Sequence, residues 1–189
     1  EMEHMLDAAG RMLRAESPEE EPLPVLELSL GGVQVAGVHV EGTNKGANAR
    51  KRLDWLVRPG HAALLTNYAE TFLLSGYLRR FSTEALRFVV GLDAVIMILN
   101  DRFYAGINGG VLGALGRLLA PNVKLYVFSM SAELLKKRLA RYGVGEAFCR
   151  VPEKELLTVA DVQLAAPAGH LLDFLREAGG VVEAESHGG

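Results

Sequence analysis

The chain has 189 residues, of which 49% are hydrophobic and 23% charged, and its formal net charge is −3. This is the composition of a globular domain, and the slightly acidic balance excludes an overall basic field that would attract nucleic acid. No apolar run reaches the roughly 18 residues that a membrane span needs, and no signal peptide is visible. The single cysteine, Cys149, cannot form an internal disulfide, so we expect a cytoplasmic protein.

The first 24 residues divide into a helix and a linker. Apolar residues recur at helical spacing over residues 1–15, which predicts an amphipathic helix. We expect this helix either to belong to a preceding domain of a longer chain or to dock on the surface of the domain that follows. Residues 16–24 are acidic and rich in proline, so they predict a linker. The organised domain then spans residues 25–185.

Beyond the linker, short apolar strands alternate with helices. Residues 25–30 and 33–40 alternate apolar and polar positions around Gly31-Gly32, which predicts a β-hairpin. Asp93 and Ser131 are suited to cap the helices that follow them. We predict further strands over residues 61–66, 86–91, 123–128, 162–165 and 181–184, and helices over residues 49–57, 68–81, 93–99, 110–119, 131–142 and 169–178.

Continuous apolar strands between helices are typical of a parallel sheet that is covered on both faces. We therefore predict an α/β fold, a Rossmann-like three-layer sandwich with a mostly parallel sheet and an added N-terminal β-hairpin. In such sheets, ligands bind beyond the carboxyl ends of the strands. The loops at these ends contribute five candidate ligand-binding residues, Thr66, Asn67, Asp93, Ser129 and Ser131. Each precedes a helix N-terminus, which favours anions, but the same residue types are ordinary helix caps and capping alone is the alternative.

A glycine-rich segment adds Asn108, Gly109 and Gly110 to the candidate ligand-binding residues. Glycines at the start of a helix let a phosphate approach the backbone. The segment is not the G-x-G-x-x-G fingerprint, however, and does not directly follow a strand. Gly113 and Gly116 continue inside the helix at a cost of about 1 kcal/mol each relative to alanine. Tight packing of this helix on the sheet or on another subunit is therefore the alternative.

A second loop combines a glycine turn, amides and cations next to a helix start. Its candidate phosphate-binding residues are Thr43, Asn44, Lys45 and Arg50, although the order of the phosphate-binding P-loop is absent. A solvated loop is the alternative. The histidines are scattered and Cys149 has no spaced partner, so the sequence predicts no metal site. It identifies no catalytic residue and no cofactor.

Three stretches carry a resemblance to known proteins. They are residues 108–119 (NGGVLGALGRLL), 122–130 (NVKLYVFSM) and 157–166 (LTVADVQLAA). Together they resemble the C-terminal region of larger bacterial proteins of ill-defined function that are labelled nicotinamide-nucleotide adenylyltransferase-like. The resemblance implies the α/β fold and a place within a larger protein. It does not extend to adenylyl transfer, because the H-x-G-H motif of those enzymes is missing and His39 and His61 stand alone.

Two functions remain as alternatives. The first is a binding domain for a nucleotide or phosphorylated metabolite, expected from the polar and glycine-rich strand ends. The second is a non-catalytic protein–protein interaction or oligomerisation domain, with a neighbouring domain or a second copy as partner. The apolar N-terminal helix and the glycine ridge of residues 110–119 point to it. We expect no nucleic acid or membrane partner.

Overall fold

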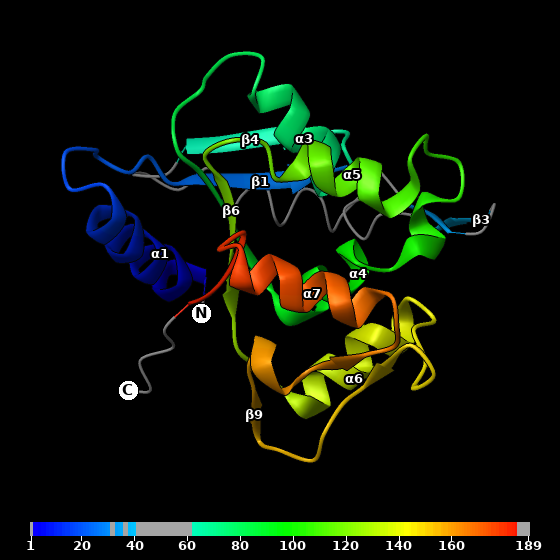
Figure 1. Cartoon of the computed structure of the whole chain (residues 1–189). Coiled ribbons are helices and arrows are strands. Elements are labelled where there is room, and N and C mark those ends of the chain that lie inside the picture. The colour runs from blue at the N-terminus through cyan, green and yellow to red at the C-terminus, as the bar shows by residue number, and fades with distance from the viewer. Residues whose placement is uncertain (1, 31–32, 36–37, 41–61, 185–189) are drawn as a thin grey trace.

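The computed structural model describes residues 2–30, 33–35, 38–40 and 62–184, and Figure 1 gives their arrangement. The helices are α1 (Met2–Glu16), α3 (Thr71–Leu78), α4 (Leu92–Ile98), α5 (Gly110–Leu118), α6 (Ala132–Arg141) and α7 (Ala168–Glu177), with 3-10 turns η1 (Asp101–Tyr104) and η2 (Val159–Asp161). The strands are β1 (Val25–Ser29), β2 (Val33–Val35), β3 (Val38–Val40), β4 (Ala62–Thr66), β5 (Leu86–Gly91), β6 (Val123–Phe128), β7 (Met130–Ser131), β8 (Cys149–Arg150), β9 (Leu156–Leu157), β10 (Gln163–Leu164) and β11 (Val181–Ala184). None of these helices is both long and apolar enough to cross a membrane.

The centre of the fold is a three-stranded parallel sheet in the order β11-β6-β5. Its register aligns Leu86 with Val123 and Val181 with Leu125. The predicted strands over residues 86–91, 123–128 and 181–184 coincide with these three elements. Their runs of apolar residues fit a parallel sheet because both faces of the sheet are covered.

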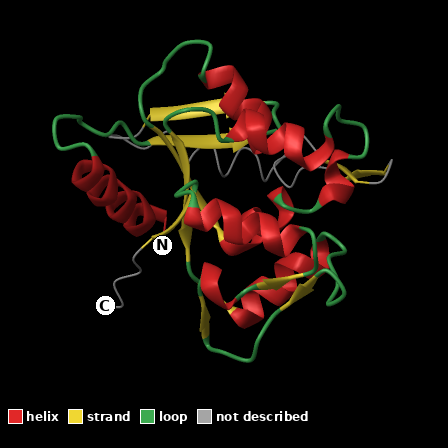
Figure 2. Ribbon diagram, viewed as in Figure 1, coloured by secondary structure: helices red, strands yellow, loops and turns green. Residues whose placement is uncertain are grey.

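The middle strand, β6, packs on both sides. Leu125 and Val127 are fully buried in the main core, and Tyr126 is fully buried in a second cluster on the opposite face. This split follows from the strand itself, because successive side chains point to opposite faces of a sheet. Helices therefore lie on both faces, and the fold is mixed α/β with parallel sheets, as expected (Figure 2).

The N-terminal helix α1 lies on the face of the sheet that carries Tyr126 and Phe128. Its buried residues Ala8 and Ala9 pack with these two rings and with Ala184. Small residues let the helix axis approach the sheet closely. The described structure thus has α1 docked on the domain, one of the two arrangements expected for it. The derivation of residues 1–15 from a preceding domain remains a prediction.

The strands near the N-terminus pair differently from the prediction. β1 runs parallel to β4, with Val25 beside Ala62 and Ser29 beside Thr66. The antiparallel pair is β2 with β3, so the predicted hairpin between residues 25–30 and 33–40 is wrong. Alternation of apolar residues indicates a strand but not its partner. The Gly-Gly signal is local, whereas a parallel partner comes from a crossover connection distant in sequence.

Other departures are smaller. The strand predicted over residues 162–165 forms as β10 but pairs antiparallel with β8, outside the central sheet. The helix predicted over residues 68–81 is the shorter α3. The helix predicted over residues 49–57 lies outside the described residues. Helices α4, α5, α6 and α7 begin and end within two residues of their predicted limits.

The glycines in and next to α5 have different structural roles. Gly109 and Gly110 have φ of 84° and 55°, in the left-handed region that favours glycine. A Cβ on Gly113 would lie 2.7 Å from the carbonyl oxygen of Asn108, whereas a Cβ on Gly116 would meet nothing within 4 Å. The two interior glycines therefore differ: Gly113 is required by sterics and Gly116 is not.

This difference predicts opposite effects of the same substitution in one helix. Gly113→Ala should lower the free energy of unfolding by about 1–3 kcal/mol, because the new methyl collides with rigid backbone. Gly116→Ala should raise it by about 0.5–1 kcal/mol, because alanine has the higher helix propensity. Urea unfolding of both variants and the wild type measures these changes. A Gly113→Ala protein as stable as the wild type would contradict the steric explanation.

Candidate functional site

The predicted residues at the carboxyl ends of β5 and β6 lie at neighbouring strand ends. Asp93 and Ser131 are hydrogen-bonded to other residues of the protein. Asp93 accepts hydrogen bonds from Nη1 of Arg138 at 3.1 and 3.2 Å. A Cβ on Gly91 would lie 2.7 Å from Oδ1 of Asp93, so the strand end is closely packed. Asp93 was expected to cap α4, and this is wrong: the N-cap position is Gly91, which makes no side-chain capping bond.

Ser131, in contrast, caps its helix as predicted. Its hydroxyl accepts a hydrogen bond from the backbone N–H of Leu134 at 3.3 Å, at the N-terminus of α6. Ser129 lies two residues earlier, between β6 and β7. At this edge the expected capping role is thus observed for Ser131. A ligand-binding role of Asp93, Ser129 and Ser131 remains a prediction.

The other predicted residues belong to different parts of the fold. Thr66 ends β4, which pairs with β1 and not with the central sheet, and Asn67 follows it. The Thr66 hydroxyl donates to Glu27 and accepts from the backbone N–H of Tyr68 at 3.3 Å. Asn108, Gly109 and Gly110 open α5. The residues proposed for weak phosphate binding, Thr43, Asn44, Lys45 and Arg50, lie outside the described residues.

A hollow of about 650 Å³ opens at the opposite edge, where β5 and β6 begin. This volume is within the roughly 300–1,000 Å³ of small-molecule pockets. Its lining contains both polar and apolar residues. The polar lining residues are Glu16, Ser17, Arg87, Asn122 and Lys124, and the apolar ones are Leu119, Val123, Phe174, Leu175 and Ala178, with Gly179 and Gly180 between α7 and β11.

Sequence reasoning missed this hollow, although a signal was present. Arg87 and Lys124 are charged residues inside the apolar strands LRFVVG and VKLYVF. In the parallel register they are direct neighbours on β5 and β6. A cation at the second position of each of two buried strands must be placed at the sheet edge, where it can find a partner.

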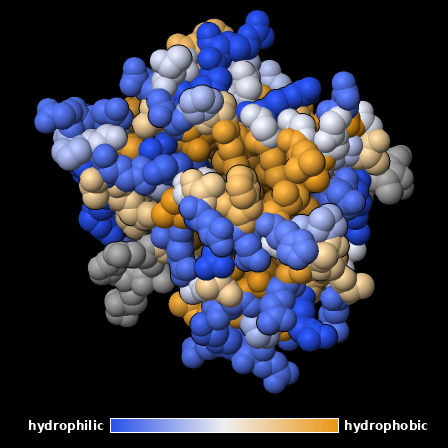
Figure 3. Space-filling view, viewed as in Figure 1, coloured by the Kyte–Doolittle hydropathy of each residue, from blue (hydrophilic) through white to orange (hydrophobic). Residues whose placement is uncertain are grey.

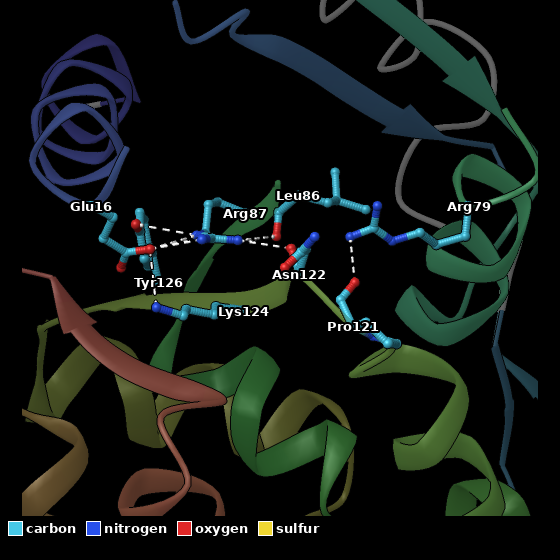
Figure 4. Close-up of polar contacts among 8 residues, drawn as sticks. All are labelled: Glu16, Arg79, Leu86, Arg87, Pro121, Asn122, Lys124 and Tyr126. Carbon is cyan, nitrogen blue, oxygen red and sulfur yellow. Dashed lines mark hydrogen bonds and ion pairs between the residues drawn. The ribbon is translucent and has the colours of Figure 1, made fainter. Parts of the chain in front are cut away.

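The partner of both cations is Glu16, the last residue of α1 (Figure 4). One carboxylate oxygen, Oε2, lies 2.7 Å from Nη2 of Arg87 and 3.0 Å from Nζ of Lys124. Nε of Arg87 also approaches the hydroxyl of Tyr126 at 3.3 Å. The network therefore joins the end of α1 to β5 and β6, two of the strands that α1 covers.

The donor groups of Arg87 are occupied by hydrogen bonds within the protein. Its side chain is only 9% exposed, and Nη1 donates to the carbonyl oxygens of Asn122 at 2.8 Å and Leu86 at 3.2 Å. Lys124 differs, because its ammonium has three donors. Its one hydrogen bond in the described structure goes to Glu16, and its side chain is 33% exposed. Lys124 is therefore the cation with donors to spare in the hollow.

The pKa values of the network follow from burial and charge. Burial alone would raise the pKa of Glu16, but hydrogen bonds from Arg87, Lys124 and Tyr126 bring it below its ordinary value of 4.5. Burial alone would lower the pKa of Arg87, but Glu16 and Tyr126 raise it overall. Burial raises the pKa of Tyr126, so its hydroxyl stays protonated at neutral pH.

Three helices end beside the hollow, α1 at Glu16, α5 at Leu118 and α7 at Glu177. Residues at or next to these ends, Ser17, Leu119 and Ala178, are part of its lining. A helix C-terminus carries about half a negative charge, which falls off within one turn. The positive charges of Arg87 and Lys124 therefore face the negative charge of Glu16 and the partial negative charges of three helix ends.

The polar groups that line the hollow are a carboxylate, two cations, an amide and a hydroxyl. Among the described residues, no group of histidine, cysteine and acidic side chains could hold a metal ion. Cys149 is buried, and burial raises the pKa of its thiol to about 11, so it is not a thiolate at neutral pH. The lining thus combines a cation that has free donors, Lys124, with several apolar side chains.

The lowered pKa of Glu16 predicts a pH-dependent contribution to stability. Glu16→Gln should lower the free energy of unfolding by about 0.5–1 kcal/mol at pH 7, because the two ion pairs are partly solvated. The loss should shrink as the pH falls below 4.5, through the folded-state pKa, because the wild-type carboxyl is then protonated too. Urea unfolding over this pH range measures it, with Glu19→Gln as the matched control. A difference that does not change with pH would contradict the assignment.

Comparison with known proteins gives no family to which the chain can be assigned. No protein-family model matches it, and neither curated proteins nor solved structures gave a match. The arguments about function therefore rest on the fold and on the geometry described above.

Proposed function

We propose that this chain is a Rossmann-like binding domain for a nucleotide or phosphorylated metabolite, working in the cytoplasm as part of a larger bacterial protein. The observation that carries the proposal is the hollow of about 650 Å³ whose lining contains both Lys124 and Phe174. Its location differs from the expected one, since it adjoins the amino ends of β5 and β6. The buried, unpaired Cys149 supports a reducing compartment.

Lys124 supports recognition of an anionic group. Its ammonium lies at the wall of the hollow and keeps donors free after its bond to Glu16. A charge-assisted hydrogen bond is worth about 1.5–3 kcal/mol, more than a neutral one. A phosphate oxygen is therefore a suitable partner.

Phe174 supports recognition of a base or another flat apolar group. It is 63% exposed on α7 and lines the hollow together with Leu119 and Ala178. Stacking of a base on an aromatic side chain contributes about 1–3 kcal/mol. A nucleotide combines a flat ring with a phosphate, and so matches both the aromatic and the cationic residue of the lining.

A binding measurement with adenosine monophosphate tests the proposal. We expect saturable binding by calorimetry, weakened about tenfold or more by Lys124→Ala because one charge-assisted bond is lost. Lys136→Ala removes an exposed lysine of α6 and serves as the matched control. No heat of binding and no thermal shift at millimolar ligand would overturn the proposal, as would equal losses in both variants.

An exposed apolar surface favours the second function, protein–protein interaction or oligomerisation. Figure 3 shows apolar residues gathered over α5 and between α5 and α7. Leu112 on α5 is 64% exposed, and Phe174 on α7 is 63% exposed. Contiguous apolar surface of this kind often marks a binding face.

Light scattering tests this second function. If the face mediates self-association, the wild type should form a dimer or larger species that Leu112→Glu dissociates, since a buried unpaired charge opposes association. Leu156→Glu changes a leucine that is 45% exposed on β9 and serves as the control. A wild type that is monomeric at high micromolar concentration and captures no partner would exclude this function.

A further inference from the structure

We propose that the hollow selects ligands with a single phosphate over polyphosphates, and that Glu16 is the residue that sets this limit. This inference rests on the proposed function and names the ligand class more narrowly. It follows from the balance of charges around the hollow, in which one carboxylate and three helix ends face two cations.

Glu16 lies where a ligand phosphate must approach. Its Oε2 atom is 3.0 Å from Nζ of Lys124, so an anion bound to the same ammonium lies near the carboxylate. Lowering of the Glu16 pKa keeps this carboxylate charged at neutral pH. Attraction to Lys124 is therefore opposed by repulsion from Glu16 over a similar distance.

Arg87 does little to relieve this repulsion. Its Nη1 group donates to two carbonyl oxygens, and its Nε and Nη2 groups both donate to Oε2 of Glu16. Recruiting Arg87 to a ligand would break contacts that are largely shielded from water. Lys124 is left to balance the charge of the ligand.

The helix ends work in the same direction as Glu16. α1, α5 and α7 all present their carboxyl ends near the hollow, where the backbone is partly negative. One phosphate contacts Lys124 and gains a favourable bond. A second and third phosphate add charge, and the described residues of the lining hold no further free cation to balance it, so these phosphates are repelled.

Glu16 and the three helix ends thus select against polyphosphates by electrostatic repulsion. Specific sites often reject the wrong ligand with an unfavourable charge rather than by additional contacts to the right one. Glu16 therefore has two roles that can be separated by experiment: it holds α1 on the sheet, and it limits the charge of the ligand. The first affects stability, and the second affects the ratio of affinities for two ligands.

The test compares adenosine monophosphate with adenosine triphosphate, without divalent metal and at constant ionic strength, by calorimetry. The wild type should bind the monophosphate more tightly than the triphosphate. Glu16→Gln should shift the ratio about tenfold toward the triphosphate, because the repulsion is lost. Glu19→Gln, which removes an exposed carboxylate from the neighbouring linker, should leave the ratio unchanged.

The outcomes separate the two proposals. Wild-type binding of the triphosphate as tightly as the monophosphate, or more tightly, would overturn the charge limit and leave the proposed function standing. The same holds for a ratio that Glu16→Gln and Glu19→Gln shift equally. No binding of either nucleotide by any form would overturn the proposed function itself. The wild-type ratio decides the charge limit even if Glu16→Gln folds poorly.

Discussion

The rest of the structure depends on the burial of β6 on both faces. Leu125, Tyr126 and Val127 have no exposed surface, so each must find apolar neighbours on its own side of the sheet. On one side these neighbours come from the main core, and on the other they come from α1. A strand covered on both faces requires helices in two layers, which is why α1 packs on the sheet.

The same constraint places the charged residues. Lys124 belongs to β6 and Arg87 to β5, yet neither can lie deep in a sheet whose interior is apolar. Both occupy the beginning of their strands, where water and the end of α1 are within reach. Glu16 then joins them, and the hollow forms between this polar cluster and the ends of α5 and α7.

The carboxyl edge shows how a local signal can have two explanations. Ser131 is suited to bind an anion or to cap a helix, and in the fold it caps α6. Asp93 was expected as a cap, but its carboxylate pairs with Arg138, which is 45 residues away in sequence. Local propensity identifies the residue types that suit a helix start. It does not identify a partner that only the folded chain brings near.

The sequence by itself determined the central strands, the helices between them and the amphipathic character of α1, because hydrophobic periodicity depends only on neighbouring residues. The hydrophobic pattern of β5 and β6 also held the clue to the missed hollow, two cations in apolar strands. Only the tertiary structure decided that β1 pairs with β4, that α1 covers Tyr126, and that Glu16 meets Arg87 and Lys124. The paired residues of β1 and β4 are 37 positions apart, and Glu16 is 71 and 108 positions from Arg87 and Lys124, and no local pattern encodes separations of that kind.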